Sequence, residues 1–339
     1  MRALRWAGPD AMTAADADEP VAGPGQAVVT VHRAGICGSD VSAYRGRMGI
    51  AQPGDVRGHE FSGVVSAVGD PADADWVGCR VTVNSQVTCG DCWACRSDRD
   101  NLCPHLQIIG VHRPGAFAEQ VAVPVRNLVE LRAGVSDELA ATAEPLAQAC
   151  HDVQLALPAR PQAALVIGAG SVGGLLVQAA RLAGIPETTV VEPHAGRRAA
   201  AADAGAASTV ESAAEAAVLA ARRTEGGFDV VFDVVGTAET RAAAVQLARA
   251  GGQVVMVGLH ADTTELPWFS VIRREISIVG ANCFDRADFE RAVGWLQDGS
   301  IRPPESVRLV TIEEGPVAFA ELAAGRASGA AKTFIAPAG

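Results

Sequence analysis

Four cysteines stand close together in the segment CGDCWACRSDRDNLC, at positions Cys89, Cys92, Cys95 and Cys103. Four thiolates at this spacing can close a tetrahedral shell around Zn²⁺, which leaves no coordination position for a substrate. The motif therefore predicts a structural zinc site. An iron–sulfur cluster and a redox dithiol are the alternative uses of such a group.

A second set of metal-ligand types is dispersed along the chain. Cys37 lies in AGICGSD, His59 and Glu60 lie in GHEFSG, and Glu144 lies in AEPLAQAC. Taken singly, Cys37 can be a buried small residue and His59 a hydrogen-bonded strand histidine. Three protein ligands with one open position are nevertheless the pattern of catalytic zinc. We interpret the set, beside the four-cysteine motif, as a second and catalytic zinc site.

A glycine motif indicates dinucleotide binding. Gly168, Gly170 and Gly173 follow the apolar run AALVI and open the apolar-faced segment VGGLLVQAARLAG. In a strand–turn–helix context such glycines allow a tight turn and close approach to a pyrophosphate. Glu192 ends the next strand, where a carboxylate accepts hydrogen bonds from ribose hydroxyls and favours NAD over NADP. Arg197, just beyond it, keeps NADP open as the less favoured cofactor, and a turn used only for packing is the structural alternative.

These motifs need elements to position them. Residues 1–147 are rich in β-type runs such as QAVVTVHRAG and FSGVVSAVG, whereas strands and helices alternate over 148–284, which predicts a doubly wound parallel sheet. Residues 285–339 read as helix, strand, helix and strand, and we expect them to return to the first domain. The uncharged stretch 163–180 has the length of a short membrane span, but its glycines favour strand, turn and helix.

Composition excludes several classes of function. The chain of 339 residues has 28 Lys+Arg against 39 Asp+Glu, a formal net charge of -11, which argues against a nucleic-acid partner. Lys332 is the only lysine, so Schiff-base chemistry has almost no candidate. The segment MRALRWAGPD has no signal-peptide pattern, and we expect a cytoplasmic protein, not bound to membranes, with reduced cysteines.

The order of these motifs resembles the zinc-dependent medium-chain alcohol and polyol dehydrogenases. The resemblance rests on CGSD from Cys37, GHE from Gly58, the four-cysteine run, Glu144-Pro145 and the glycine motif, and it spans essentially the whole chain. It implies a GroES-like catalytic domain over 1–147, a Rossmann coenzyme domain over 148–284, and two zinc ions per chain. Cys37 and His59 map onto zinc ligands. Either Glu60 or Glu144 is the third ligand, and the other bonds the zinc-bound water.

The resemblance also assigns coenzyme contacts by position. They lie in the glycine motif, at the end of the second strand and in three later loops. Carried over in this way are Gly168, Gly170, Val172, Gly173, Glu192, Arg197, Val235, Gly236, Val257, Gly258, Leu259, Ala281, Asn282 and Cys283.

The resemblance implies an oxidation in which zinc lowers the pKa of a substrate hydroxyl and hydride passes to the nicotinamide. Ser39 matches the family hydroxyl that takes the alcohol proton. Ser42 stands where many relatives have a histidine that continues the proton relay, so the relay must end elsewhere, in water or through Glu60 and Glu144.

The substrate is predicted from motif similarity. The segments CGSDVSAYRG and EPHAGRR are similar to dehydrogenases of aminoglycoside and aminocyclitol pathways in antibiotic biosynthesis, which favours a secondary ring hydroxyl of an amino sugar, aminocyclitol or aminoglycoside intermediate. A polyol or sugar of the sorbitol type, or a threonine-like amino alcohol, is the alternative. The small-molecule substrate is thus a polyhydroxylated or amino-substituted ring in the main hypothesis.

Two other functional classes compete with this hypothesis. A non-catalytic dinucleotide-binding protein would be marked by loss of the metal-ligand residues, and a zinc-free quinone or enoyl reductase by loss of both metal sets. The strand ISIVGA is expected to pair between subunits in a homodimer or homotetramer. The remaining polar candidates are assigned mainly packing or strand-end roles, with pocket lining as the alternative for the last two: Cys79, Cys150, Asp229, Asp233, His112 and Tyr44.

Overall fold

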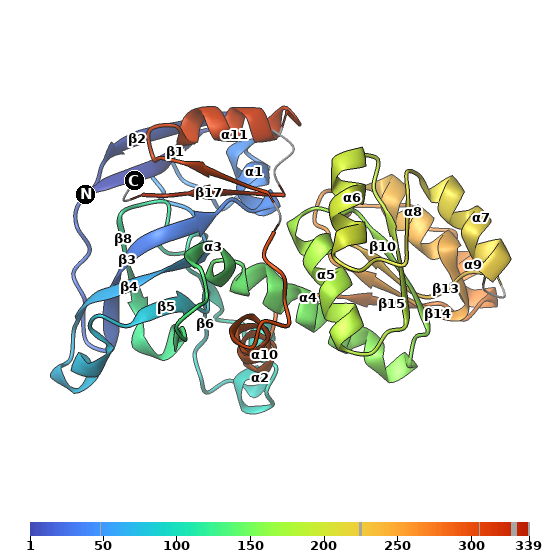
Figure 1. The fold of residues 1–339 in the computed structure, drawn as a ribbon, viewed down its shortest axis with the longest axis horizontal. Helices are drawn as coiled ribbons and strands as arrows, with labels where there is room; N and C mark the ends of the chain where they lie inside the picture. Colours follow the sequence, from blue (N-terminus) through green and yellow to red (C-terminus); the bar gives the residue numbers. More distant parts are fainter. Residues whose placement is uncertain (48, 224–225, 305, 327–330, 338–339) are drawn as a thin grey trace. The chain divides into compact units, whose positions relative to one another are not determined.

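The computed structural model describes residues 1–47, 49–223, 226–304, 306–326 and 331–337. The chain forms two compact units, one made of Met1–Glu144 and Asp285–Gly339 and the other of Pro145–Phe284 (Figure 1). Each unit has a sheet and a hydrophobic core of its own.

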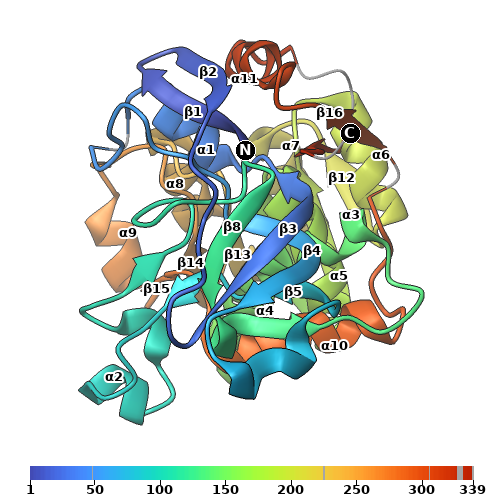
Figure 2. The same ribbon diagram turned by 90° about the vertical axis from the view of Figure 1, so that its left-hand side faces the viewer.

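The first unit is built on a mostly antiparallel sheet, in which β3, β4 and β5 lie side by side (Figure 2). The strand order is β16-β17-β3-β4-β5-β9, and β8 also pairs with β3. The strands of this sheet are β3 (Gln26–Gly35), β4 (Glu60–Val68), β5 (Arg80–Val83), β8 (Gln120–Pro124), β9 (Leu128–Glu130), β16 (Val307–Val310) and β17 (Lys332–Ile335). Two hairpins accompany it, β1 (Arg2–Gly8) with β2 (Ala11–Asp16) and β6 (Gln86–Val87) with β7 (Gln107–Ile108).

Residue types explain the close pairing of β3 and β4. Alternating valines of β3, among them Val29 and Val31, enter the core with Phe61 of β4, and β-branched side chains suit such a half-buried pleated surface. Gly63 faces β3 so closely that a Cβ there would lie 2.1 Å from the Thr30 carbonyl oxygen. Only glycine therefore fits at this position of the ladder.

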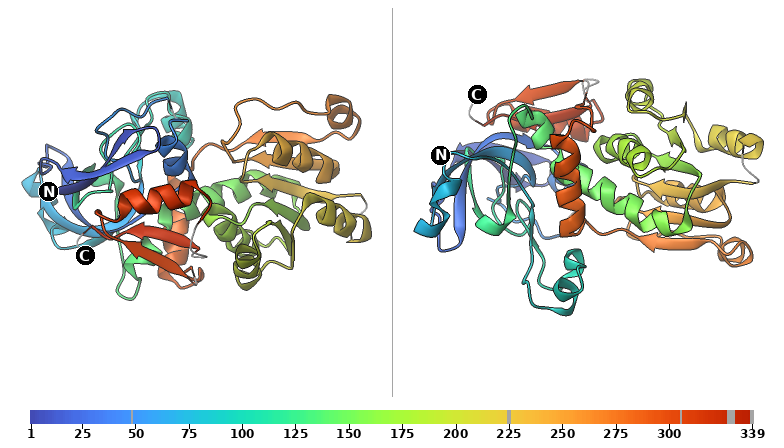
Figure 3. Two further views of the ribbon diagram at one scale, coloured as in Figure 1. Left: turned by 90° about the horizontal axis from the view of Figure 1, so that it is seen from above. Right: turned by 60° about the horizontal axis from the view of Figure 1, so that its bottom comes forward.

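The helices of the first unit are short, apart from two in the C-terminal segment. They are α1 (Gly38–Tyr44), α2 (Trp93–Arg96), α3 (Asp137–Ala140), α10 (Arg286–Gln297) and α11 (Gly315–Ala323). The predicted helix, strand, helix and strand after residue 285 are confirmed by α10, β16, α11 and β17. β17 pairs with β3, and α11 packs against α1 and β2, so these late elements belong to the fold of the first unit (Figure 3).

The second unit has a parallel sheet in the order β12-β11-β10-β13-β14-β15. Its strands are β10 (Ala163–Ile167), β11 (Glu187–Val191), β12 (Ser208–Val210), β13 (Phe228–Asp233), β14 (Ala248–Met256) and β15 (Ser277–Gly280). The helices that alternate with them are α5 (Ser171–Leu182), α6 (Ala195–Asp203), α7 (Ala213–Arg223), α8 (Ala238–Leu247) and α9 (Trp268–Arg273). This strand order is that of dinucleotide-binding folds, and the predicted fold class is confirmed.

Several elements are absent from the sequence prediction. Among them are the β1–β2 hairpin, the short helices α1, α2 and α3, α4 (Ala143–Ala156), β12, α7 and α9. The predicted strand, turn and helix within residues 163–180 are confirmed, because β10 is followed by α5. None of the helices in the described part of the chain combines the length and apolar composition that crossing a bilayer requires.

Candidate functional site

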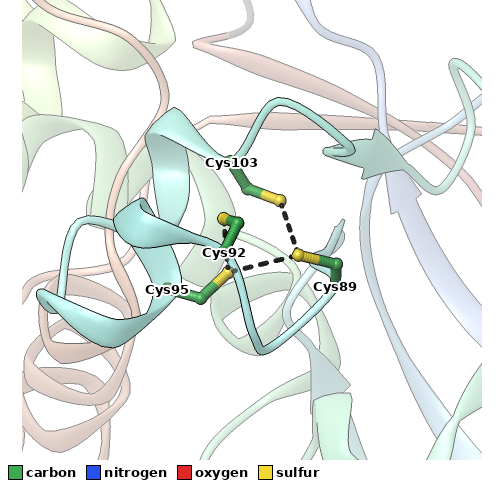
Figure 4. Close-up of side chains that lie close together, drawn as sticks. All are labelled: Cys89, Cys92, Cys95 and Cys103. Carbon is green, nitrogen blue, oxygen red and sulfur yellow. Dashed lines mark hydrogen bonds between the residues drawn. The ribbon is translucent and has the colours of Figure 1, made fainter.

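The four-cysteine segment forms a small lobe of the first unit, built around α2 (cyan in the right-hand view of Figure 3). The four sulfur atoms face one another across a common centre (Figure 4). Sγ of Cys103 lies 3.5 Å from that of Cys89, Sγ of Cys92 lies 3.5 Å from that of Cys95, and Sγ of Cys89 lies 3.9 Å from that of Cys95. Four sulfurs bonded to zinc at about 2.3 Å stand about 3.8 Å apart, so the donor set fits the predicted ion.

Local hydrogen bonds make the four thiols unequal. The backbone N–H of Cys95 lowers the pKa of Cys92 to about 6, because it stabilises the thiolate. The backbone N–H groups of Asp91 and Cys92 favour the thiolate of Cys89 and would lower its pKa. Hydrogen bonds to the side chains of Asp91 and Cys103, together with desolvation, outweigh them and raise this pKa to about 12. Cys92 therefore forms a thiolate readily, whereas a dication that binds the cluster would have to displace the proton of Cys89.

The dispersed ligands meet on the first unit. The ligand atoms of Cys37, His59 and Glu60 all lie within 4.8 Å of one another. Cys37 is the N-cap residue of α1, His59 directly precedes β4, and Glu60 is its first residue. Oε1 of Glu60 has no hydrogen-bond partner among the described residues, and Oε2 faces a buried ammonium group, that of Lys332. A buried carboxylate beside a thiol and an imidazole is a donor set that suits zinc, so the residues fit the predicted catalytic metal.

Burial and negative charge shape the protonation of this cluster. Desolvation, followed by the Glu60 carboxylate, raises the pKa of the Cys37 thiol to about 12. Burial alone would lower the pKa of His59, but the carboxylates of Asp40, Glu144 and Glu60 outweigh it and raise that pKa. A dication placed here would reverse both preferences, since it binds thiolate and neutral imidazole.

Glu144 lies near this cluster but outside the group of three closely spaced ligands. It stands in the first turn of α4, and desolvation raises its pKa to about 8, helped by the Glu60 charge and opposed by His59. Glu60 therefore lies within 4.8 Å of the other two ligand types, whereas Glu144 lies outside this group. Ser39, on α1, hydrogen-bonds to the Cys37 thiol.

Lys332 is a part of the site that the sequence analysis missed. This sole lysine lies on β17, and its buried Nζ forms an ion pair with Oε2 of Glu60. Burial alone would lower the pKa of Lys332, but the charges of Glu60 and Cys37 raise it. From the sequence alone, this lysine is a candidate only for Schiff-base chemistry. The pairing of β17 with β3, which brings residue 332 here, has no local sequence signal.

The glycine motif has the geometry of a phosphate-binding turn. Gly168 has φ +98°, and a Cβ at Gly173 would lie 2.0 Å from the Gly168 carbonyl oxygen, so α5 packs closely on the turn. Gly170 has open space around it and is the N-cap residue of α5. Val172, in the first turn of α5, stands beside the unpaired N–H groups that bind phosphate at helix N-termini.

Glu192 is held rigidly at the end of β11. Its two carboxylate oxygens accept hydrogen bonds from the backbone N–H groups of Ala169 and His194, both at 2.9 Å. The side chain is buried, and the half-exposed guanidinium of Arg197 lies 4.0 Å from it. The carboxylate is thus fixed beside the glycine turn.

Asp233 organises two loops in which later coenzyme contacts are predicted. Its carboxylate accepts hydrogen bonds from the N–H groups of Val235 and Gly236, and its backbone carbonyl accepts them from Val257 and Gly258. Desolvation raises the pKa of the Asp233 carboxyl group, although the hydrogen bonds that its carboxylate accepts from Gly236 and Val235 oppose this rise. The predicted strand-end role of Asp233 is therefore more specific than expected, because one residue joins two loops.

The remaining candidates are placed as follows. Leu259 is exposed, Ala281 donates its N–H to the Met256 carbonyl, and Cys283 has φ +49° after Asn282. The ring of Tyr44 packs on Phe319 in the core, 5.7 Å between centroids. His112 accepts a hydrogen bond from the Ile108 N–H, and Asp229 forms an ion pair with Arg249. Cys79 is partly buried and Cys150 is buried.

Comparison with known proteins agrees with this arrangement. Residues 23–133 match the alcohol dehydrogenase GroES-like domain, and residues 171–298 match the zinc-binding dehydrogenase family. The chain is 33% identical over 280 residues to 2-dehydro-3-deoxy-L-galactonate 5-dehydrogenase from Pseudoalteromonas atlantica, with 82% of each chain covered. It is 32% identical to L-threonine 3-dehydrogenase from a Chelativorans species, with 77% of each covered.

A solved structure supports the same assignment. A zinc-binding dehydrogenase from Sinorhizobium meliloti 1021, bound to NADP, superposes with a TM-score of 0.90 at 31% identity, and 99% of each chain is covered. Both family matches and the full-length similarity agree with the two ligand clusters and the glycine turn. The chain is therefore an enzyme of the zinc-dependent medium-chain dehydrogenase family.

Proposed function

We propose that this dehydrogenase oxidises a secondary hydroxyl of a polyhydroxylated carbon chain, such as a polyol or sugar acid, to a ketone with NAD as hydride acceptor. A threonine-like amino alcohol is the second member of this substrate class. The observation that carries the proposal is the buried meeting of Cys37, His59 and Glu60 in one unit, in a chain whose other unit has a dinucleotide turn.

The names of the two curated relatives support the position of the oxidised carbon. One is a 5-dehydrogenase of a sugar acid and the other a 3-dehydrogenase of threonine, so both act on a hydroxyl inside a chain. Neither name refers to an aminoglycoside or aminocyclitol. The amino-sugar substrate predicted from sequence therefore has no support from these relatives, and the polyol or amino-alcohol alternative is the better one.

The residues of the first unit would divide the work among them. Cys37, His59 and Glu60 would hold zinc, which as a Lewis acid makes a nearby hydroxyl more acidic. Ser39, bonded to the Cys37 thiol, is suited to accept the hydroxyl proton, and Glu144 is suited to pass it on, since its pKa of about 8 allows both forms near neutrality. The four-cysteine lobe would hold a second zinc with a structural role.

NAD is the proposed cofactor because of Glu192. Its buried carboxylate cannot turn away, since two backbone N–H groups hold it, and a 2′-phosphate beside it would meet a like charge. The NADP-bound relative shows that this fold can also hold NADP. Arg197, 4.0 Å from Glu192, is the residue that would offset this preference.

A substrate survey tests the proposal. We would follow reduced-nicotinamide absorbance with NAD and with NADP across polyols, sugar acids, threonine, aminocyclitols and amino sugars. The expected result is turnover of a polyol, sugar acid or amino alcohol with NAD. Turnover confined to amino sugars would restore the earlier hypothesis, and turnover with none of them would refute the proposed class.

Two cysteine variants provide the matched comparison. Cys37→Ser should abolish turnover. Cys79→Ser makes the same change at a thiol that donates a hydrogen bond to the Asp75 carbonyl and belongs to neither ligand cluster, so it should leave turnover intact. Equal activity of the two variants would remove Cys37 from the reaction.

A further inference from the structure

Arg57 is the largest side chain that the fold buries completely, with 1% of its surface exposed. It lies two residues before His59, and its backbone carbonyl accepts a hydrogen bond from the Phe117 N–H at 2.8 Å. None of its three guanidinium nitrogens has a hydrogen-bond partner among the described residues. Burying an arginine without hydrogen bonds is costly, so its charge must be compensated nearby.

The compensating group is Asp40, which is also fully buried. Nε of Arg57 lies 3.6 Å from Oδ1 of Asp40, with 1% and 0% of the two side chains exposed. Because attraction between charges is strong where water is absent, this pair holds together without ideal hydrogen-bond geometry. Asp40 is thus held by a cation that is not one of the proposed metal ligands.

Asp40 touches two of the proposed ligands. Its Oδ2 accepts a hydrogen bond from the backbone N–H of Cys37 at 3.0 Å, and its Oδ1 lies 3.7 Å from Nδ1 of His59. This distance is longer than a hydrogen bond, but a carboxylate on this side of the ring favours the form with the proton on Nδ1, which leaves Nε2 available to a metal. One carboxylate therefore orients both a thiol and an imidazole.

The number of acidic groups around His59 gives a second reason for a cation beside Asp40. The acids Asp40, Glu60 and Glu144 and the thiol of Cys37 crowd one buried region, where the charges of Asp40, Glu60 and Glu144 all act on His59. Lys332 pairs with Glu60, which leaves Asp40 to Arg57. Without Arg57, the Asp40 carboxylate would lose the buried guanidinium that lies 3.6 Å from it.

We propose that Arg57 is a positioning residue of the metal centre, which acts by holding the Asp40 carboxylate against Nδ1 of His59 and the backbone of Cys37. The inference rests on the proposed function, because it concerns the metal of that site. No motif of the family resemblance includes Arg57, and its role follows from burial and distance alone.

Cobalt binding tests the inference in the full-length, zinc-depleted protein. A site with one thiolate and a site with four thiolates give different charge-transfer and ligand-field absorption bands, so both are titrated in one sample. Arg57→Met should weaken Co²⁺ binding at the one-thiolate site by about 10–100-fold, the usual loss when a residue behind a ligand is removed. Binding by the four-cysteine lobe should not change, which makes the lobe an internal control for folding.

Two matched variants separate positioning from general stability. Arg57→Lys keeps the charge and should restore most of the affinity. Arg80→Met makes the same replacement at a half-buried arginine that forms an ion pair with Asp137 of α3. This variant should bind Co²⁺ at both sites with wild-type affinity. Wild-type affinity in a folded Arg57→Met protein would overturn the inference.

A double-mutant comparison remains decisive even if Arg57→Met alone does not fold. Removing both charges of a buried pair is tolerated better than removing one. If Arg57 acts through Asp40, then Asp40→Asn and Asp40→Asn/Arg57→Met should bind Co²⁺ within about threefold of each other, whereas a further tenfold loss in the double variant would overturn the inference. A wild-type protein that shows only four-thiolate bands would instead refute the metal centre of the proposed function.

Discussion

The pair of Lys332 and Glu60 shows how single residues stabilise the site. Both side chains are buried, and Lys332 supplies the opposite charge for Glu60. Lys332→Met would leave Glu60 without that partner, and breaking a buried pair in this way costs about 3–5 kcal/mol. We expect this loss in the free energy of unfolding of the metal-free protein, measured by denaturant titration with circular dichroism.

The same pair offers its own control. Lys332→Met/Glu60→Gln removes both charges, and the double variant should recover much of the stability that the single variant loses, because no uncompensated charge remains. A double variant less stable than Lys332→Met would show that the ion pair is not the reason for the loss.

The two serines of α1 separate proton transfer from packing. Ser39 hydrogen-bonds to the Cys37 thiol, whereas Ser42 lies further along α1, at the position that the family resemblance assigns to a relay histidine. Ser39→Ala should lower kcat about 100-fold or more, the usual contribution of a positioned proton acceptor, and Ser42→Ala should lower it less than about threefold. Steady-state kinetics with the best substrate of the survey measures both. Large and equal losses would contradict this division of roles.

Glu192 is expected to set the cofactor preference. A like charge beside the 2′-phosphate costs several kcal/mol, and every 1.4 kcal/mol is about tenfold. Glu192→Ser should therefore reduce the ratio of kcat/KM for NAD to that for NADP by about 10–100-fold. Glu211→Ser, an exposed acidic residue paired with Arg198, is the control and should leave the ratio unchanged. An unchanged ratio in Glu192→Ser would move the preference to another residue.

At the scale of elements, α3 is tied to the main sheet of the first unit through one acidic residue. The Asp137 carboxylate bonds Nη2 of Arg80 on β5 at 2.6 Å and Nδ1 of His32 on β3 at 2.9 Å. Desolvation would raise the pKa of Asp137, but these bonds to Arg80 and His32 outweigh it and lower the pKa from 3.8. The carboxylate therefore stabilises the folded state above pH 3.8, and this stabilisation is lost as pH falls through the lower, folded-state pKa.

This linkage predicts a pH-dependent effect of substitution. Asp137→Asn should lower the melting temperature of the protein at pH 7, and the difference from wild type should shrink as pH falls below about 4, where the aspartate itself becomes protonated. Thermal unfolding of both proteins across this range is the measurement. Asp18→Asn, at an exposed position, should give no difference at any pH. A constant difference for Asp137→Asn would rule out the charge as its cause.

Elements also show how far sequence alone can go. Alternating valines predicted β3 and β4, and an apolar run followed by glycines predicted β10 and α5, because these patterns are local. Alanine-rich α7 was missed even though its apolar and polar residues lie on different faces of the helix. The ligand residues could be named from motifs, but their partners Lys332 and Arg57 could not. Both depend on pairings between distant segments.

Gly35 illustrates such a pairing. It lies opposite Glu60 in the β3–β4 register and opposite Phe334 in the β17–β3 register. A Cβ here would lie 2.2 Å from Oε2 of Glu60 and 2.8 Å from Cε of Lys332. Because Gly35 has no side chain, it leaves space for the ion pair of Glu60 and Lys332. The residues next to Gly35 in the sequence do not predict this packing.

At the scale of the molecule, we propose that residues 1–147, 148–284 and 285–339 are a catalytic domain, a coenzyme domain and a segment that completes the first. The two compact units support this division. Both candidate metal clusters belong to residues 1–147, and the segment after 284 supplies Lys332. Strand β17, near the end of the chain, is therefore needed before the proposed ligand Glu60 has its ion-pair partner.

The number of zinc ions per chain tests the whole arrangement. Wild-type protein should hold about two, one in each cluster, as four thiolates close one shell and Cys37, His59 and a carboxylate leave the other open. Cys37→Ser should hold about one and stay folded, since the lobe keeps its own ion. Cys79→Ser should still hold two. Zinc analysis after dialysis measures these values, and a folded wild-type protein with no zinc would refute both metal sites.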